Sequence, residues 1–102
     1  MSDKIKELIT EELERAEGIH SPMHTGHEGY GIMLEEIEEL IDEISELSDH
    51  FDELWDNIKA DNVAGQTIWI QELRTRSEKA ITEAIQFAAM VERYEKDVLE
   101  GK

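Results

Sequence analysis

Residues 28–59 read EGYGIMLEEIEELIDEISELSDHFDELWDNIK, and one helical pattern runs through all of them. Apolar residues recur at alternating steps of three and four, which is the spacing of a helix that packs along a seam. This apolar row is Leu34, Ile37, Ile41, Ile44, Ser48, Phe51, Trp55 and Ile58, with one polar member. We predict a single helix of about 33 residues, roughly 50 Å long. A kink or break near Ser48 is the alternative.

The segment that precedes this stretch predicts a shorter helix and a loop. Residues 3–17 carry apolar side chains at helical spacing, and Gly18 is well placed to end that helix. Residues 18–27 are rich in helix breakers, including Pro22, and predict a loop. Thr25 is followed three residues later by a glutamate, so we expect it to cap the long helix.

The segment that follows predicts a turn over residues 60–66 and a last helix over residues 67–100, whose apolar residues again alternate by three and four. Two long helices joined by a short turn form an antiparallel hairpin. The sequence therefore predicts an all-α fold with a short N-terminal helix and a long antiparallel helical hairpin. Such a hairpin would expose apolar surface, so we expect it to assemble into an oligomeric helical bundle.

Composition sets limits on the class of protein. The 102 residues predict one domain spanning residues 1–102. The chain has 26 acidic and 10 basic residues, a net charge of −16, so we expect no direct binding to nucleic acid. It contains no cysteine, which excludes disulfides. No apolar run approaches the length of a membrane span, and the N-terminus is unlike a signal peptide. We expect a cytoplasmic protein without membrane attachment.

Carboxylates are concentrated in the first half of the long helix. Glu35, Glu36 and Glu39 form the pattern E-E-x-x-E, and Glu83 and Gln86 repeat the three-residue spacing on the last helix. In an antiparallel hairpin, or across a dimer, such pairs can converge into the oxygen-rich cage that Mg²⁺ and Mn²⁺ prefer. Helical periodicity alone puts these residues at the edge of the apolar stripe or outside it. A solvated acidic face is therefore the alternative.

Three segments resemble the MazG-like branch of the all-α nucleoside triphosphate pyrophosphohydrolases. They are the loop GIHSPMHTGH (18–27), the helix start HEGYGIMLEEIEEL (27–40) and EAIQFAAM (83–90). Members of that family cleave between the α and β phosphates of a nucleoside triphosphate. They use Mg²⁺ held by the carboxylates of E-E-x-x-E and E-x-x-D, in dimers or tetramers of helical bundles. The resemblance implies a single MazG-like domain.

Carried over by position, the resemblance implies that Glu36, Glu39, Glu83 and Gln86 hold the metal, and that Glu35 is a further ligand or supports the ligands. We expect Glu35 and Glu36 to be the catalytic residues. Two departures bear on activity. Gln86 stands where the family has Asp, and a neutral amide offers an oxygen but no charge, so metal affinity should be lower. The stretch between the two motifs, residues 40–82, is also longer than in most members.

Candidate substrate-binding residues come from two places. Arg76 and Lys79 precede Glu83 on a similar side of the last helix and could neutralise a triphosphate. Ion pairs with nearby glutamates are the alternative for both. His27 and Tyr30 begin the long helix, where backbone N–H groups favour anions.

The resemblance thus implies a Mg²⁺-dependent hydrolase, in which Mn²⁺ can replace Mg²⁺, that converts nucleoside triphosphates to monophosphates and pyrophosphate. The alternative is an acidic helical-bundle interaction protein that keeps the scaffold without a working metal site. A third hypothesis is an acidic decoy for a basic nucleic-acid-binding protein. Gln86 favours the second hypothesis over the first, whereas the three charged candidate ligands favour the first.

Overall fold

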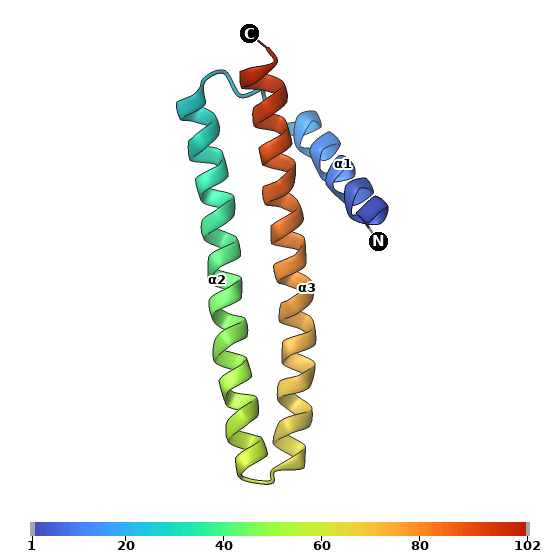
Figure 1. Ribbon diagram of the computed structural model, residues 1–102, viewed down its shortest axis with the longest axis vertical. Helices are drawn as coiled ribbons and strands as arrows, with labels where there is room; N and C mark the ends of the chain where they lie inside the picture. The colour runs from blue at the N-terminus through green and yellow to red at the C-terminus, as the bar shows by residue number, and fades with distance from the viewer. Residues whose placement is uncertain (1, 102) are drawn as a thin grey trace.

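The computed structural model describes residues 2–101, and these fold into three α-helices and a closing π-helical turn (Figure 1). The elements are α1 (Ser2–Ile19), α2 (Gly26–Lys59), α3 (Val63–Tyr94) and η1 (Glu95–Leu99). No strand occurs in the described part of the chain. The all-α prediction and the long hairpin, formed by α2 and α3, are confirmed. Within residues 2–101, no helix combines the length and apolar character needed to cross a lipid bilayer.

The long helix α2 begins where its capping residue predicts. Thr25 is its N-cap, and the Thr25 side-chain oxygen accepts a hydrogen bond of 3.1 Å from the backbone N–H of Glu28. This bond satisfies one of the free N–H groups of the first turn. The helix then continues without a break to Lys59, so the alternative of an interruption near Ser48 is wrong.

The hairpin turn is shorter than predicted, because α3 begins at Val63 and not at residue 67. Asn62 caps α3 by accepting a hydrogen bond from the N–H of Gly65 at 3.0 Å, which lets the helix begin directly after it. Asp61 adopts a positive φ of 54°, the left-handed conformation that reverses the chain. Of the helix breakers in the predicted turn, Asn62 therefore acts as the cap and Asp61 as the turn residue, whereas Gly65 lies inside α3.

Helix α1 lies against the C-terminal half of α3, on the side away from α2 (Figure 1). It extends through Gly18 to Ile19, so the prediction that Gly18 ends this helix is wrong. The C-terminal end of α1 is linked to η1 by an ion pair between the Lys96 ammonium and the Glu17 carboxylate at 2.8 Å. Helix α1 therefore covers part of the hairpin, as its amphipathic pattern predicts.

The buried core is at the end of the molecule where α1, the loop after it and η1 meet. It comprises Ala16, Met23, Ala89, Met90 and Val98. Met23 comes from the loop and is only 1% exposed, so the loop is packed into the core. The described residues extend 60 × 27 × 21 Å, and the hairpin beyond this core is only two helices thick.

The loop is also held by polar contacts from the last turns of the chain. The buried guanidinium of Arg93 donates a hydrogen bond to the carbonyl oxygen of Ser21 and lies 3.6 Å from the Asp97 carboxylate. Asp97 in turn accepts a hydrogen bond of 2.9 Å from the N–H of Met23. Because buried polar groups need partners, these contacts determine the path of the loop.

The interface between α2 and α3 is not formed by the apolar row that the sequence marks as the seam. On α2, the half-buried and buried side chains follow the neighbouring stripe, which comprises Leu40, Glu43, Leu47, His50, Leu54 and Asn57. Most of the apolar row is exposed, with Phe51 at 64% and Trp55 at 56%. The periodicity identified correctly which residues share a face, but α3 covers the stripe beside it. The apolar row is left without a neighbour in the single chain.

Candidate functional site

Three carboxylates from both arms of the hairpin converge at one point. Oxygen atoms of Glu36 and Glu39 on α2 and of Glu83 on α3 all lie within 4.8 Å of one another. Glu36 and Glu39 are three residues apart and so lie on one side of α2, and α3 brings Glu83 opposite them. Among residues 2–101 this is the one group of three or more His, Cys, Asp or Glu side chains with the proximity that a metal ion requires.

The Glu36 carboxylate is the part of this cluster most affected by its surroundings. One of its oxygens, Oε2, is buried without a hydrogen-bond partner. Burial raises the pKa of Glu36, and the negative charges of Glu39, Glu83, Glu12 and Glu35 raise it further. A partly buried carboxylate among like charges favours its protonated form unless a cation is close by.

The Glu83 carboxylate on α3 is in a similar environment to that of Glu36. Its Oε2 is also buried and without a partner. Burial, followed by the adjoining carboxyl groups of Glu39 and Glu43, raises its pKa, whereas the Lys79 ammonium acts in the opposite direction. One lysine therefore offsets only part of the repulsion among these acidic groups.

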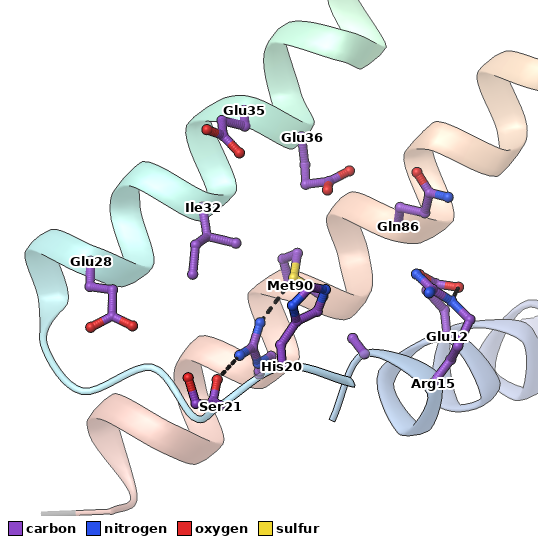
Figure 2. A pocket seen from close by; sticks show the side chains of 12 residues that line it. Glu12, Arg15, His20, Ser21, Glu28, Ile32, Glu35, Glu36, Gln86 and Met90 are labelled. Carbon is purple, nitrogen blue, oxygen red and sulfur yellow. Dashed lines mark hydrogen bonds and ion pairs between the residues drawn. The ribbon is translucent and has the colours of Figure 1, made fainter. Parts of the chain in front are cut away.

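A pocket of about 390 Å³ opens beside the cluster, between α1, the loop, α2 and α3. This volume is within the range of small-molecule sites. Its lining includes Glu35 and Glu36 on α2, Gln86 on α3, and Glu12 with Arg15 on α1 (Figure 2). Its lining is completed by Ala16, His20, Ser21, Glu28, Ile32, Met90 and Arg93. Glu36 belongs both to the carboxylate cluster and to the pocket, so it connects the two.

The predicted substrate-binding residues lie elsewhere. Arg76 forms an ion pair of 2.9 Å with Glu46, and Lys79 forms one of 3.1 Å with the buried carboxylate of Glu43. Neither cation lines the pocket, which agrees with the alternative of ion pairs along the hairpin. A role in phosphate binding stays a prediction for both.

His27 and Tyr30, on the first turns of α2, are exposed, and neither lines the pocket. Tyr30 is 64% exposed. Their neighbour Glu28 is the residue of this helix start that faces the cavity. A contact between substrate and His27 or Tyr30 stays a prediction.

Two pocket residues were not singled out from the sequence as parts of a site. They are Glu12 and Arg15, and both come from α1. The Arg15 Nε atom donates a hydrogen bond of 3.0 Å to Glu12, the common pairing of residues three apart on a helix. That spacing is visible in the sequence, but the docking of α1 beside Gln86 is not.

The donor set suits a hard divalent cation. The three clustered carboxylates are the oxygen ligands that Mg²⁺ and Mn²⁺ prefer, and Gln86 lines the pocket beside them. The buried, unpartnered oxygens of Glu36 and Glu83 are the kind of atom that a bound cation would satisfy. No zinc-type set of His and Cys ligands is found in the described residues.

Comparison with family models, curated proteins and solved structures finds no match to this chain. The resemblance to MazG-like proteins therefore stays a prediction. The function is therefore inferred from the positions of the side chains in the site.

Proposed function

We propose that the chain is a Mg²⁺-dependent nucleoside triphosphate pyrophosphohydrolase of the MazG-like type. The observation that supports this most directly is the convergence of Glu36, Glu39 and Glu83 beside a pocket of suitable size. In the sequence, these three residues are the charged positions that the resemblance assigns to the metal. They approach one another only because the hairpin folds in the register described above.

The proposal gives each group a chemical role. Glu36, Glu39, Glu83 and the amide oxygen of Gln86 would hold Mg²⁺, or Mn²⁺ in its place. A bound cation would supply Lewis-acid chemistry, neutralising phosphate charge and lowering the pKa of a coordinated water. The triphosphate would occupy the pocket, where Arg15 and Arg93 are the cations that line it.

Glu35 is our candidate for the general base. It is exposed and lines the pocket next to Glu36, so its carboxylate can accept a proton from a water molecule there. The water oxygen would form a bond to the α-phosphorus. The bond from that phosphorus to the oxygen bridging the α and β phosphates would break, and pyrophosphate would leave with the electron pair.

The proposal includes a second copy of the chain. The exposed apolar row of α2 directly follows the buried stripe, position by position, and Ile70, Ala84 and Val91 likewise follow buried or half-buried residues on α3. In an antiparallel pair, the positions that follow the seam flank the same side of both helices. A shared apolar face of this kind, rimmed by acids, is typical of an interface between copies.

The test is pyrophosphate release from the common ribo- and deoxyribonucleoside triphosphates, with Mg²⁺ or Mn²⁺. We expect turnover of at least one nucleotide, its loss in Glu36→Gln, and its retention in Glu38→Gln, an exposed neighbour outside the cluster. If no nucleotide is cleaved and calorimetry detects no metal binding, the enzymatic proposal is wrong.

The second candidate is an acidic interaction protein without catalysis. The observation that favours it is Gln86, which contributes no charge at the position where the MazG-like pattern has an aspartate. The two candidates differ in metal binding, because an interaction protein has no need to bind Mg²⁺ at the carboxylate cluster.

A further inference from the structure

Helix α1 brings a fourth carboxylate to the pocket. The Glu12 side chain is only 16% exposed and lines the same cavity as Glu36 and Gln86. In Figure 2, Glu12 and Arg15 stand together beside Gln86. This carboxylate comes from a different helix than the acids of the two sequence motifs, so neither motif includes it.

Glu12 shares the lining of this pocket with Glu36, the member of the carboxylate cluster that faces it. At the same time both carboxylate oxygens of Glu12 are engaged by Arg15, through Nε at 3.0 Å and through Nη2. Arg15 itself is affected by Glu36, whose negative charge adds to that of Glu12 in raising the Arg15 pKa.

Gln86 explains why an extra carboxylate matters here. It lies next to Glu12 in the lining of two adjoining cavities, and it is the neutral member of the proposed ligand set. A divalent cation facing an amide in place of a carboxylate has one negative charge fewer to balance it. Glu12 can restore that charge from α1.

We propose that Glu12 supplies the negative charge that Gln86 lacks at the metal site, and that Arg15 is its counter-ion until a metal ion binds. Glu12 then turns from Arg15 to the cation. Arg15, whose side chain is 56% exposed, becomes available to the phosphates of a triphosphate. This inference depends on the proposed function for the identity of the site, and it adds a role for α1 in metal binding.

The experiment measures metal binding without nucleotide. Mn²⁺ is titrated into the full chain, with free Mn²⁺ followed by electron paramagnetic resonance, and Mg²⁺ is titrated by calorimetry. We expect Glu12→Gln to weaken Mn²⁺ binding about tenfold or more, as loss of a supporting group typically does. Glu14→Gln removes an equal charge from an exposed position of the same helix outside this pocket, and should bind like the parent chain.

Two further variants test the roles separately. Arg15→Gln should tighten Mn²⁺ binding, because it frees Glu12 and removes a competing cation, yet it should weaken binding of a triphosphate. Gln86→Asp, combined with Glu12→Gln, should restore the affinity that Glu12→Gln loses. Circular dichroism and thermal unfolding of each variant confirm that α1 remains folded.

The outcomes separate this inference from the proposed function. If Glu39→Gln abolishes Mn²⁺ binding while Glu12→Gln binds like the parent, the role of Glu12 is overturned and the metal site stands. If Glu12→Gln weakens binding but no triphosphate is cleaved, the role of Glu12 stands and the enzymatic proposal fails. If the parent chain binds no Mn²⁺ at all, both are overturned.

Discussion

At the scale of single residues, the surroundings of Glu36 disfavour its charged form and so reduce stability. Its carboxylate is partly buried, has an oxygen without a partner, and faces acids on three helices. A chain selected only for stability would place a neutral side chain here. The exchange of stability for a reactive or binding group is common at functional sites.

The raised pKa of Glu36 predicts how stability depends on pH. The folded state holds the proton more tightly than the unfolded chain, whose carboxyl titrates near 4.5. The destabilising effect is therefore absent at low pH and grows as the pH rises from 4.5 through the raised pKa. The groups responsible are Glu35 and Glu39 on α2, Glu83 on α3 and Glu12 on α1.

We expect Glu36→Gln to raise the melting temperature of the metal-free protein by a few degrees at pH 7.5 and by less at pH 5. Urea or thermal unfolding at the two pH values checks this. Glu38→Gln, on the exposed side of α2, is the control for the change in net charge. An equal gain from both variants would show that overall repulsion, and not the cluster, is responsible.

Gly29 predicts a second effect, through packing. A Cβ atom added there would lie 2.5 Å from the Tyr94 ring, so the helix start can approach α3 only without a side chain. Gly29→Ala should reduce the free energy of unfolding by about 1–3 kcal/mol, the usual effect of overpacking.

Gly31 is the matched control for Gly29, two residues further along the same helix. A Cβ atom there would meet nothing within 4 Å. Gly31→Ala should therefore raise the free energy of unfolding by about 0.5–1 kcal/mol, because alanine is the better helix former. Chemical denaturation of both variants measures the contrast. Similar losses from the two would contradict the close approach of Tyr94.

At the scale of elements, the hairpin interface is narrow and partly polar. Leu54 is buried in it, while Glu43, His50 and Asn57 occupy the same stripe. His50 packs edge-on against Trp69 at 5.1 Å between ring centroids. Apolar burial between α2 and α3 is therefore limited, and each leucine of the stripe contributes a large share.

Leu54→Ala should reduce the free energy of unfolding by about 2 kcal/mol, which is at the low end of the range for a buried leucine. The loss is small because Leu54 lies near the hairpin turn, where only two helices pack together. Ile44→Ala, whose side chain is 52% exposed in the single chain, should change it little at concentrations where the protein is monomeric. Urea unfolding at low concentration compares them. Equal losses would mean that the apolar row is buried within the chain.

The sequence predicted where the helices lie along the chain more accurately than it predicted which helix faces pack together. Helical periodicity and the Thr25 cap were sufficient to predict α2 from near Gly26 to Lys59, since both signals are local. Which helix covers which stripe depends on contacts between distant segments. The apolar row was therefore recognised correctly as a face but assigned to the wrong interface.

The same distinction applies to the candidate site. Glu36, Glu39 and Glu83 could be named from the sequence because they lie in two short patterns, and the structure brings them together. Glu12 and Arg15 could not, because their position beside Gln86 follows from the docking of α1 on α3. Arg76 and Lys79 were chosen for their charge and their side of the helix, and acids across the hairpin pair with both.

At the scale of the whole molecule, the exposed apolar row predicts self-association. We expect sedimentation analysis to show a dimer or larger species. Phe51→Glu should shift it to monomer, because a charge cannot be buried there without a partner. Ser45→Glu adds the same charge on an exposed position outside the row and should leave the assembly intact. A parent chain that sediments as a monomer would contradict this prediction.

The contacts of Arg93 and Asp97 with the loop also have a consequence for how the protein is made. A nascent chain emerges from the ribosome in order, so α1, the loop and α2 are available before these two residues. The loop cannot take its final path until Asp97 can accept the N–H of Met23. A polypeptide stopped just short of Asp97 would contain every proposed ligand, from Glu12 to Gln86, but not the carboxylate that accepts the N–H of Met23 in the loop.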